Sequence, residues 1–223
     1  MARSVLVTGA NRGLGRAVAE HLHALGWRVV LAARNGAQAA EAAHSVGTDW
    51  VELDTADADS VKRAYDTVGP VDALVNNAGV LLDGGTDPLT VPLDLVEQTF
   101  MINVIGSWRV SQTFVPAMVE RGWGRVVMVS SGTATFHNGL FAGAPGYSAS
   151  KTALNGLTTM LAAQTRSTGV LVNAVNPGMT RTRMMPHAQR SPEEAAVDIG
   201  YAVTLPDDGP TGAFLRGRNQ IEW

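Results

Sequence analysis

Short apolar runs that alternate with longer, helix-patterned segments are the feature of this 223-residue sequence that most constrains its fold. The runs are continuously apolar, which is typical of strands buried on both faces of a parallel sheet. Gly, Asn and Asp punctuate these Val-rich runs, which argues against a mostly helical protein. We expect strands at 4–8, 28–33, 50–54, 73–77, 125–130, 171–175 and 213–215, and helices near 14–25, 36–46, 57–68, 93–121, 148–167 and 192–204.

The alternation predicts a single α/β domain that spans residues 1–223. We expect a Rossmann-type doubly wound parallel sheet, with right-handed crossover helices on both of its faces. The chain has 45% hydrophobic and 17% charged residues, which is sufficient for a sizeable buried core.

Composition also narrows the classes of partner. The net charge of −3 argues against a nucleic-acid binder, because such domains are usually basic. The absence of cysteine excludes a disulfide framework and a thiolate metal site, and it fits a cytoplasmic protein. The N-terminal residues lack the apolar run of a signal peptide, and no run approaches the roughly 18 apolar residues of a membrane helix. We therefore expect neither nucleic acid nor membrane as a partner.

A glycine-rich turn, TGANRGLG, joins the first expected strand to the first expected helix. Glycines at such a junction let the backbone approach a pyrophosphate, which then lies at the positive end of the helix dipole. The spacing G-x-x-x-G-x-G differs from the common G-x-G-x-x-G, and the alternative is a turn that merely needs positive φ. The position of the turn favours a dinucleotide site formed by Gly9, Asn11, Arg12, Gly13, Leu14 and Gly15.

The residues that follow the second expected strand indicate which dinucleotide binds. An acidic residue there would bind the ribose hydroxyls of NAD, but no carboxylate occurs between Val29 and Gly36. Arg34 takes that place, and Arg12 can approach the same point from the glycine turn. Guanidinium groups suit a 2′-phosphate through charge-assisted bonds, so the sequence favours NADP over NAD. The alternative is that Arg34 is a solvated residue at the start of the helix.

Tyr147 lies four residues before Lys151, with only Ser and Ala between them. In a helix these two side chains lie on one face. A free phenol has a pKa of about 10, which is too high for efficient proton exchange near neutrality. A nearby ammonium stabilises the phenolate, so we expect Lys151 to lower the pKa of Tyr147. The alternative is an incidental pair on a solvated helix face.

Six ordered motifs together resemble the short-chain dehydrogenases/reductases over nearly the whole chain. They are TGANRGLG, NNAG (76–79), Asn103 in MINVIGSW, VSS (129–131), YSASK (147–151) and NPGMTRT (176–182). The NRG of the turn, the AAR after the second strand and the C-terminal end look like the carbonyl-reductase-like, NADPH-dependent members. The resemblance implies seven strands in the order 3-2-1-4-5-6-7. It also implies reversible hydride transfer between NADPH and a ketone or aldehyde, with the corresponding alcohol as product.

The resemblance implies a catalytic set composed of Asn103, Ser131, Tyr147 and Lys151. Tyr147 would act as the general acid/base, and Ser131 would orient the substrate oxygen, with Ser130 as the competing candidate. Lys151 would also hold the hydroxyls of the nicotinamide ribose. Asn103 would hold a water molecule in a proton relay that reaches the lysine.

The resemblance also implies further cofactor contacts. Asp54 would contact the adenine amino group, the NNAG segment would wall the adenosine side, and the PGMTRT segment would face the nicotinamide carboxamide. The complete cofactor set comprises Gly9, Asn11, Arg12, Gly13, Leu14, Gly15, Arg34, Asp54, Thr55, Asn76, Ala78, Gly79, Tyr147, Lys151, Pro177, Gly178 and Thr182.

Three segments, 81–91, 132–146 and 183–191, are expected to frame the substrate pocket. The last segment is short, which suggests an open pocket. His137 and His187 have no carboxylate at a fixed spacing, so we interpret them as surface residues, and no metal-site or acyl-transfer motif occurs. The expected apolar walls of the pocket are Phe136, Leu140, Phe141, Met184 and Met185.

The sequence leaves two alternatives to an NADPH-dependent reductase open. One is an NAD-dependent alcohol or hydroxysteroid-type dehydrogenase on the same fold, and the other is a regulatory protein that binds NADP without turnover. The complete catalytic set speaks against the second. Tyr147 lies only 16 positions after Ser131, a gap far shorter than in animal carbonyl reductases, in which an insertion blocks an association face. The resemblance therefore implies a homodimer or homotetramer formed through segments 93–121 and 148–167.

Overall fold

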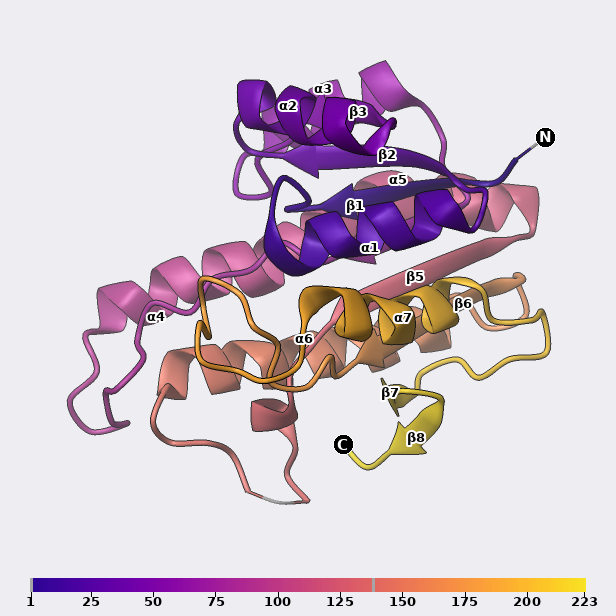
Figure 1. Cartoon of the computed structure of the whole chain (residues 1–223). Coiled ribbons are helices and arrows are strands. Elements are labelled where there is room, and N and C mark those ends of the chain that lie inside the picture. The colour runs from indigo at the N-terminus through magenta and orange to yellow at the C-terminus, as the bar shows by residue number, and fades with distance from the viewer. Residues whose placement is uncertain (1, 138) are drawn as a thin grey trace.

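A mostly parallel eight-stranded sheet forms the centre of the computed structural model, which describes residues 2–137 and 139–223 (Figure 1). Neighbouring strands follow the order β3-β2-β1-β4-β5-β6-β7-β8, and β7 with β8 forms an antiparallel pair. The strands are β1 (Ser4–Thr8), β2 (Arg28–Ala33), β3 (Asp49–Glu52), β4 (Ala73–Asn76), β5 (Gly124–Val129), β6 (Val170–Val175), β7 (Phe214–Arg216) and β8 (Asn219–Ile221).

Helices cover both faces of the sheet, as expected from the continuously apolar strands (Figure 1). One face packs against α1, α2 and α7, and the other packs against α3, α5 and α6. The helices are α1 (Gly13–Ala24), α2 (Gly36–Val46), α3 (Ala58–Val68), α4 (Leu93–Phe100), α5 (Ser107–Arg121), α6 (Pro145–Gln164) and α7 (Pro192–Val203).

The structure confirms the doubly wound α/β fold and the predicted order of the first seven strands. The eighth strand was not expected. Gly217, with φ of +61°, lets the chain reverse after Arg216, and Asn219 then pairs with Arg216. The strand has three residues, too few for its apolar pattern to stand out in the sequence.

The predicted helix 93–121 contains a wide turn at its centre. A π-helix, η1 (Met101–Gly106), joins α4 to α5 without a break. None of the helices in residues 2–137 and 139–223 combines the length and apolar character needed to cross a membrane.

Candidate active site

The glycine turn has the geometry that close approach of a dinucleotide requires. Gly9 and Gly13 have φ of +63° and +54°, which side-chain-bearing residues rarely adopt. A Cβ added at Gly15 would lie 2.4 Å from Nδ2 of Asn77 and 2.5 Å from the carbonyl oxygen of Gly9. Helix α1 begins within the turn, at Gly13, with no side-chain cap and no acidic residue in its first turn. Its N-terminal N–H groups suit an anion, so the residues fit a pyrophosphate.

Two polar residues fasten this turn to the end of β4. The hydroxyl of Thr8 accepts hydrogen bonds from the backbone N–H groups of Asn77 and Ala78, each at 3.0 Å. The side-chain amide of Asn77 donates to the carbonyl oxygens of Thr8 (2.8 Å) and Gly9 (3.2 Å). The sequence prediction assigned no role to Thr8, and it gave Asn77 only the role shared by the NNAG segment, a wall of the adenosine side. Their positions in TGANRGLG and NNAG were the available signal.

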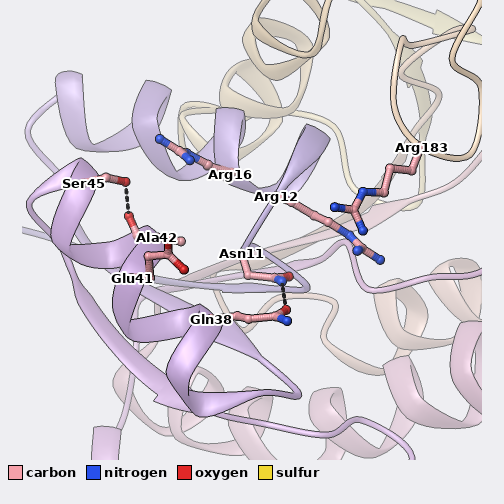
Figure 2. A pocket seen from close by; sticks show the side chains of 8 residues that line it. All are labelled: Asn11, Arg12, Arg16, Gln38, Glu41, Ala42, Ser45 and Arg183. Atoms are coloured by element: carbon pink, nitrogen blue, oxygen red, sulfur yellow. Dashed lines mark hydrogen bonds between the residues drawn. The ribbon is translucent and has the colours of Figure 1, made fainter.

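A polar pocket of about 310 Å³ lies beside the glycine turn, between α1 and α2 (Figure 2). Arg12 and Arg183 point toward each other there, although Arg183 comes from the segment after β6 (Figure 2). Neither forms a salt bridge within residues 2–137 and 139–223. Arg34 is exposed after β2 and is not among the lining residues. The pocket is lined by Asn11, Arg12, Arg16, Gln38, Glu41, Ala42, Ser45 and Arg183.

Tyr147 and Lys151 lie one turn apart near the start of α6, as predicted, and both are buried. Nζ of Lys151 is 5.7 Å from the centre of the Tyr147 ring and donates a 2.8 Å hydrogen bond to the carbonyl oxygen of Val129. Val129 is the last residue of β5, so both groups lie at the carboxyl edge of the sheet. Parallel α/β sheets bind their ligands at this edge.

Burial changes the protonation of both groups. It raises the pKa of the Tyr147 phenol, and a hydrogen bond with the Ser131 side chain acts in the opposite direction. Burial lowers the pKa of Lys151 to about 8. The predicted lowering of the Tyr147 pKa is therefore wrong for the protein alone, because loss of hydration outweighs the effect of its neighbours.

Ser131 follows the last residue of β5 by two positions, and its side chain acts to lower the pKa of the Tyr147 phenol. Its hydroxyl also accepts bonds from N–H and Oγ1 of Thr133, at 3.2 and 3.0 Å. The competing candidate, Ser130, is buried and donates a 2.6 Å bond to Oδ1 of Asn155 on α6. The structure therefore favours Ser131, whose side chain affects the phenol pKa, over Ser130, whose hydroxyl joins the end of β5 to α6.

Asn103 lies in η1 and is fully buried. Its amide donates to the carbonyl oxygen of Val80 (2.9 Å) and to Oγ of Ser150 (3.0 Å), and it accepts from the N–H of Val80 (2.8 Å). A Cβ added at Gly79 would lie 3.2 Å from Oδ1 of Asn103 and 3.4 Å from Nζ of Lys151. Asn103 and Lys151 therefore flank the same glycine. The side chain of Asn103 is engaged by protein groups, so the predicted water relay has no direct support.

The segment after β6 folds back toward the glycine turn. A Cβ added at Gly13 would lie 3.6 Å from Cγ2 of Thr182. Arg190 clamps the base of the segment by donating to the carbonyl oxygens of Pro177 (2.8 Å) and Glu194 (3.0 Å) and by pairing with Asp198 at 2.8 Å. Thr182 and Pro177 thus lie on the same side of the sheet as the glycine turn.

The remaining predicted cofactor residues lie at the ends of β3, β4 and β6. Asp54 accepts a 3.0 Å hydrogen bond from the N–H of Ala56, and Thr55 is buried against Gly106. Asn76 is buried and donates to Oγ of Ser111 at 3.0 Å. Gly178 has φ of +71° and donates its N–H to Oδ1 of Asn176.

The predicted substrate residues are all solvent-exposed, at 41% or more. None of them lines the polar pocket beside the glycine turn. His137 and His187 are exposed, as predicted for surface residues, and residue 138 of the predicted segment 132–146 lies outside the described residues. These predicted substrate residues are Phe136, Leu140, Phe141, Met184 and Met185.

Comparisons with known proteins identify the family. The family model described as short chain dehydrogenase matches residues 3–193. L-xylulose reductase of Bos taurus is 33% identical over 222 residues, which cover 99% of this chain and 86% of the relative. Carbonyl reductase (NADPH) 2 of Sus scrofa is 36% identical over 193 residues, which cover 85% of this chain and 77% of the relative.

A solved structure described as a short chain dehydrogenase/reductase family protein agrees with the sequence comparisons. It matches with a TM-score of 0.88 and 30% identity, covering 97% of this chain and 95% of that one. The glycine turn, the buried Tyr147–Lys151 pair and these matches lead to one assignment. The chain belongs to the short-chain dehydrogenase family of oxidoreductases.

Proposed function

We propose that the protein is an NADPH-dependent reductase of ketones or aldehydes, with Tyr147 as the general acid. The observation that carries this proposal is the meeting of Tyr147, Lys151 and Ser131 at the carboxyl edge of the sheet. A hydroxyl-bearing ring held between a serine and an ammonium can donate a proton to a carbonyl oxygen.

Each residue has a defined task in this proposal. Bound nicotinamide supplies the hydride. The phenol of Tyr147 donates its proton to the substrate oxygen, and Ser131 orients that oxygen by hydrogen bonding. Lys151, held by the carbonyl oxygen of Val129, stabilises the negative charge that the phenol acquires. Asn103 fixes the backbone of Val80 and the side chain of Ser150, which border the lysine.

The preference for NADPH rests on the charges beside the glycine turn. Arg12 and Arg183 lie together without a carboxylate partner in the described chain, so an anion between them would remove their repulsion. Arg34, exposed directly after β2, is the third cation that we assign to the 2′-phosphate. The name of the porcine relative, carbonyl reductase (NADPH) 2, agrees with this preference.

Exposed apolar side chains support a carbonyl substrate with an apolar body. Phe136, Phe141 and Met184 are exposed on the segments after β5 and β6. Their side chains can close around a substrate that is bound against Ser131 and Tyr147. We propose that residues 81–91, 132–146 and 183–191 frame this pocket, in an enzyme that acts in the cytoplasm.

The catalytic proposal is tested with wild-type protein and Tyr147→Phe. We expect wild type to oxidise NADPH with members of a carbonyl panel, measured by NADPH absorbance. Tyr147→Phe should lower kcat by about 10²- to 10⁴-fold, because it removes the proton donor and leaves the ring in place. The control is NADPH binding by fluorescence, which should change little.

The kinetics and binding of the two cofactors distinguish the proposed reductase from an NAD-dependent dehydrogenase and from a regulatory protein that binds NADP without turnover. A lower KM for NADH than for NADPH would favour the NAD-dependent dehydrogenase. Tight NADPH binding without turnover in either variant would favour the regulatory protein.

A further inference from the structure

Asp83 is a fully buried carboxylate within residues 81–91, a segment expected to wall the substrate pocket. It lies instead against the N-terminus of α6, the helix that carries Tyr147 and Lys151. One carboxylate oxygen accepts a 2.5 Å hydrogen bond from the N–H of Gly146. The N–H of Tyr147 lies 3.3 Å from both oxygens. A side chain 64 residues earlier in the chain therefore contacts the backbone of the proposed general acid.

The start of α6 explains why a distant residue is needed there. The residue at the N-cap is Ala144, whose side chain cannot accept a hydrogen bond. Pro145 follows and has no N–H to offer. The N–H groups of Gly146 and Tyr147 are thus the first donors of the helix, and Asp83 takes the part that a capping Ser or Asp normally has.

The charge of Asp83 is compensated by the helix itself. Within residues 2–137 and 139–223, no Lys, Arg or His forms a salt bridge with Asp83. A buried carboxylate is costly unless it is hydrogen-bonded or paired. The peptide donors and the positive end of the dipole of α6, which has 20 residues, meet that need. The contact therefore holds the first turn of α6 in one place.

The same stretch of chain is bonded to α6 at a second point. Val80 exchanges two hydrogen bonds with Asn103, and the amide of Asn103 also donates to Ser150. Residues 80–83 therefore connect the end of the NNAG segment with both ends of the Tyr147–Lys151 turn. Thr86 donates to the carbonyl oxygen of Asp83 at 2.7 Å and fixes the backbone of the carboxylate.

We propose that Asp83 is a positioning residue for the reaction. Its carboxylate sets the place of the first turn of α6, so that the phenol of Tyr147 stays aligned with Ser131 and with the carbonyl to be reduced. This inference rests on the proposed function for its catalytic consequence. Displacement of a reacting group by about 1 Å can cost 100-fold in rate, so loss of the contact affects turnover more than cofactor binding.

Two variants change the contact from its two sides. Asp83→Asn keeps one acceptor oxygen but loses the charge and places an NH₂ group beside the N–H groups of the helix. Gly146→Ala keeps the carboxylate but introduces a Cβ that would lie 3.0 Å from its Oδ2 and 3.1 Å from Cγ2 of Val96. Asp57→Ala is the matched control, because Asp57 caps α3 through a 2.9 Å bond to the N–H of Asp59.

We expect Asp83→Asn and Gly146→Ala each to lower kcat by about 10- to 100-fold, with little change in the KM for NADPH. Asp83→Ala should lower kcat at least as much as Asp83→Asn. Asp57→Ala should lower the Tm and leave kcat unchanged. Wild-type kcat in both Asp83→Asn and Gly146→Ala would overturn the proposal, even if both variants were less stable.

A second readout does not depend on turnover. The ultraviolet absorbance of tyrosinate, measured against Tyr147→Phe, reports the titration of the Tyr147 phenol. Asp83→Asn and Gly146→Ala should shift this titration, since they move the ring relative to Ser131. An unshifted titration in both variants would overturn the positioning role. A shifted titration in a protein that reduces no carbonyl would instead contradict the proposed function and leave the contact confirmed.

Discussion

At the residue scale, the site is a small group of buried polar side chains whose protonation is set mainly by the loss of water. Burial raises the pKa of Tyr147 and lowers the pKa of Lys151 to about 8, so at neutral pH the phenol is neutral and the lysine is still mostly protonated. The bond with Ser131 partly offsets the effect on the phenol. The one-turn spacing of Tyr147 and Lys151 is therefore not sufficient by itself to lower the pKa of the phenol.

A substitution of Arg183 tests the proposed preference for NADPH, which carries a 2′-phosphate, over NADH. Arg183→Gln removes one of the two guanidinium groups that face each other beside the glycine turn. We expect the Kd for NADPH to rise by about 10-fold while the Kd for NADH stays nearly constant, because a charge-assisted bond to a phosphate is lost. Fluorescence titration measures both constants.

The control for this prediction is Arg166→Gln, which removes an exposed arginine just after α6. Equal weakening of NADPH and NADH by Arg183→Gln would assign Arg183 to the pyrophosphate instead of the 2′-phosphate.

At the element scale, the continuous α4–η1–α5 unit serves two purposes. Its π-helix centre presents Asn103 to Val80 and Ser150 on the inner side. Its outer side leaves Met101, Ile105 and Trp108 exposed at 38% or more. We propose that this outer side, with α6, forms the interface of a homodimer or homotetramer, since exposed apolar groups on one helix face mark an association surface.

Ile105→Glu tests this interface. A carboxylate on the apolar face should convert the oligomer to a monomer, because its desolvation at the interface is costly. Sedimentation velocity measures the mass. Trp50→Glu is the matched control, because Trp50 is 47% exposed on β3, an edge strand of the sheet, and its change should leave the mass unaltered. A wild-type mass for Ile105→Glu would contradict the assignment.

At the scale of the whole molecule, the buried ammonium of Lys151 links stability to pH. In the fold the pKa of Lys151 is about 8, while the unfolded value is 10.5. Between these values the unfolded chain binds more protons than the folded one, so this group makes the free energy of unfolding rise with pH. Across this pH range, the deprotonation of Lys151 adds about 3 kcal/mol to the free energy of unfolding.

Lys151→Met removes this dependence. Relative to wild type, the variant should be most stabilised below pH 8 and should lose that advantage as the pH approaches 10. Urea unfolding at a series of pH values measures the difference. Lys62→Met, at an exposed lysine on α3, should show no such loss of advantage. A difference between Lys151→Met and wild type that stays constant from pH 7 to 10 would contradict the prediction.

Local patterns in the sequence were sufficient for most of the fold. Val-rich runs and helix periodicity predicted the first seven strands, and the observed helices begin and end within three residues of their predicted limits. The same patterns could not show η1 or β8. A single π turn inside a long helix is too short to change the apolar period of the sequence around it, and a three-residue strand has almost no periodicity.

The sequence by itself determined which chemical groups are available: a glycine turn, a Tyr–Lys pair on one helix face and an arginine in place of an acid after β2. Only the tertiary structure decided where Asp83, Asn77 and Arg183 act. Asp83 lies 63 positions from Gly146, and Asn77 lies 69 positions from Thr8. Arg183 lies 171 positions from Arg12. Such contacts arise because strands that are distant in the sequence end at one edge of the sheet. A local sequence pattern cannot predict which residues come together there.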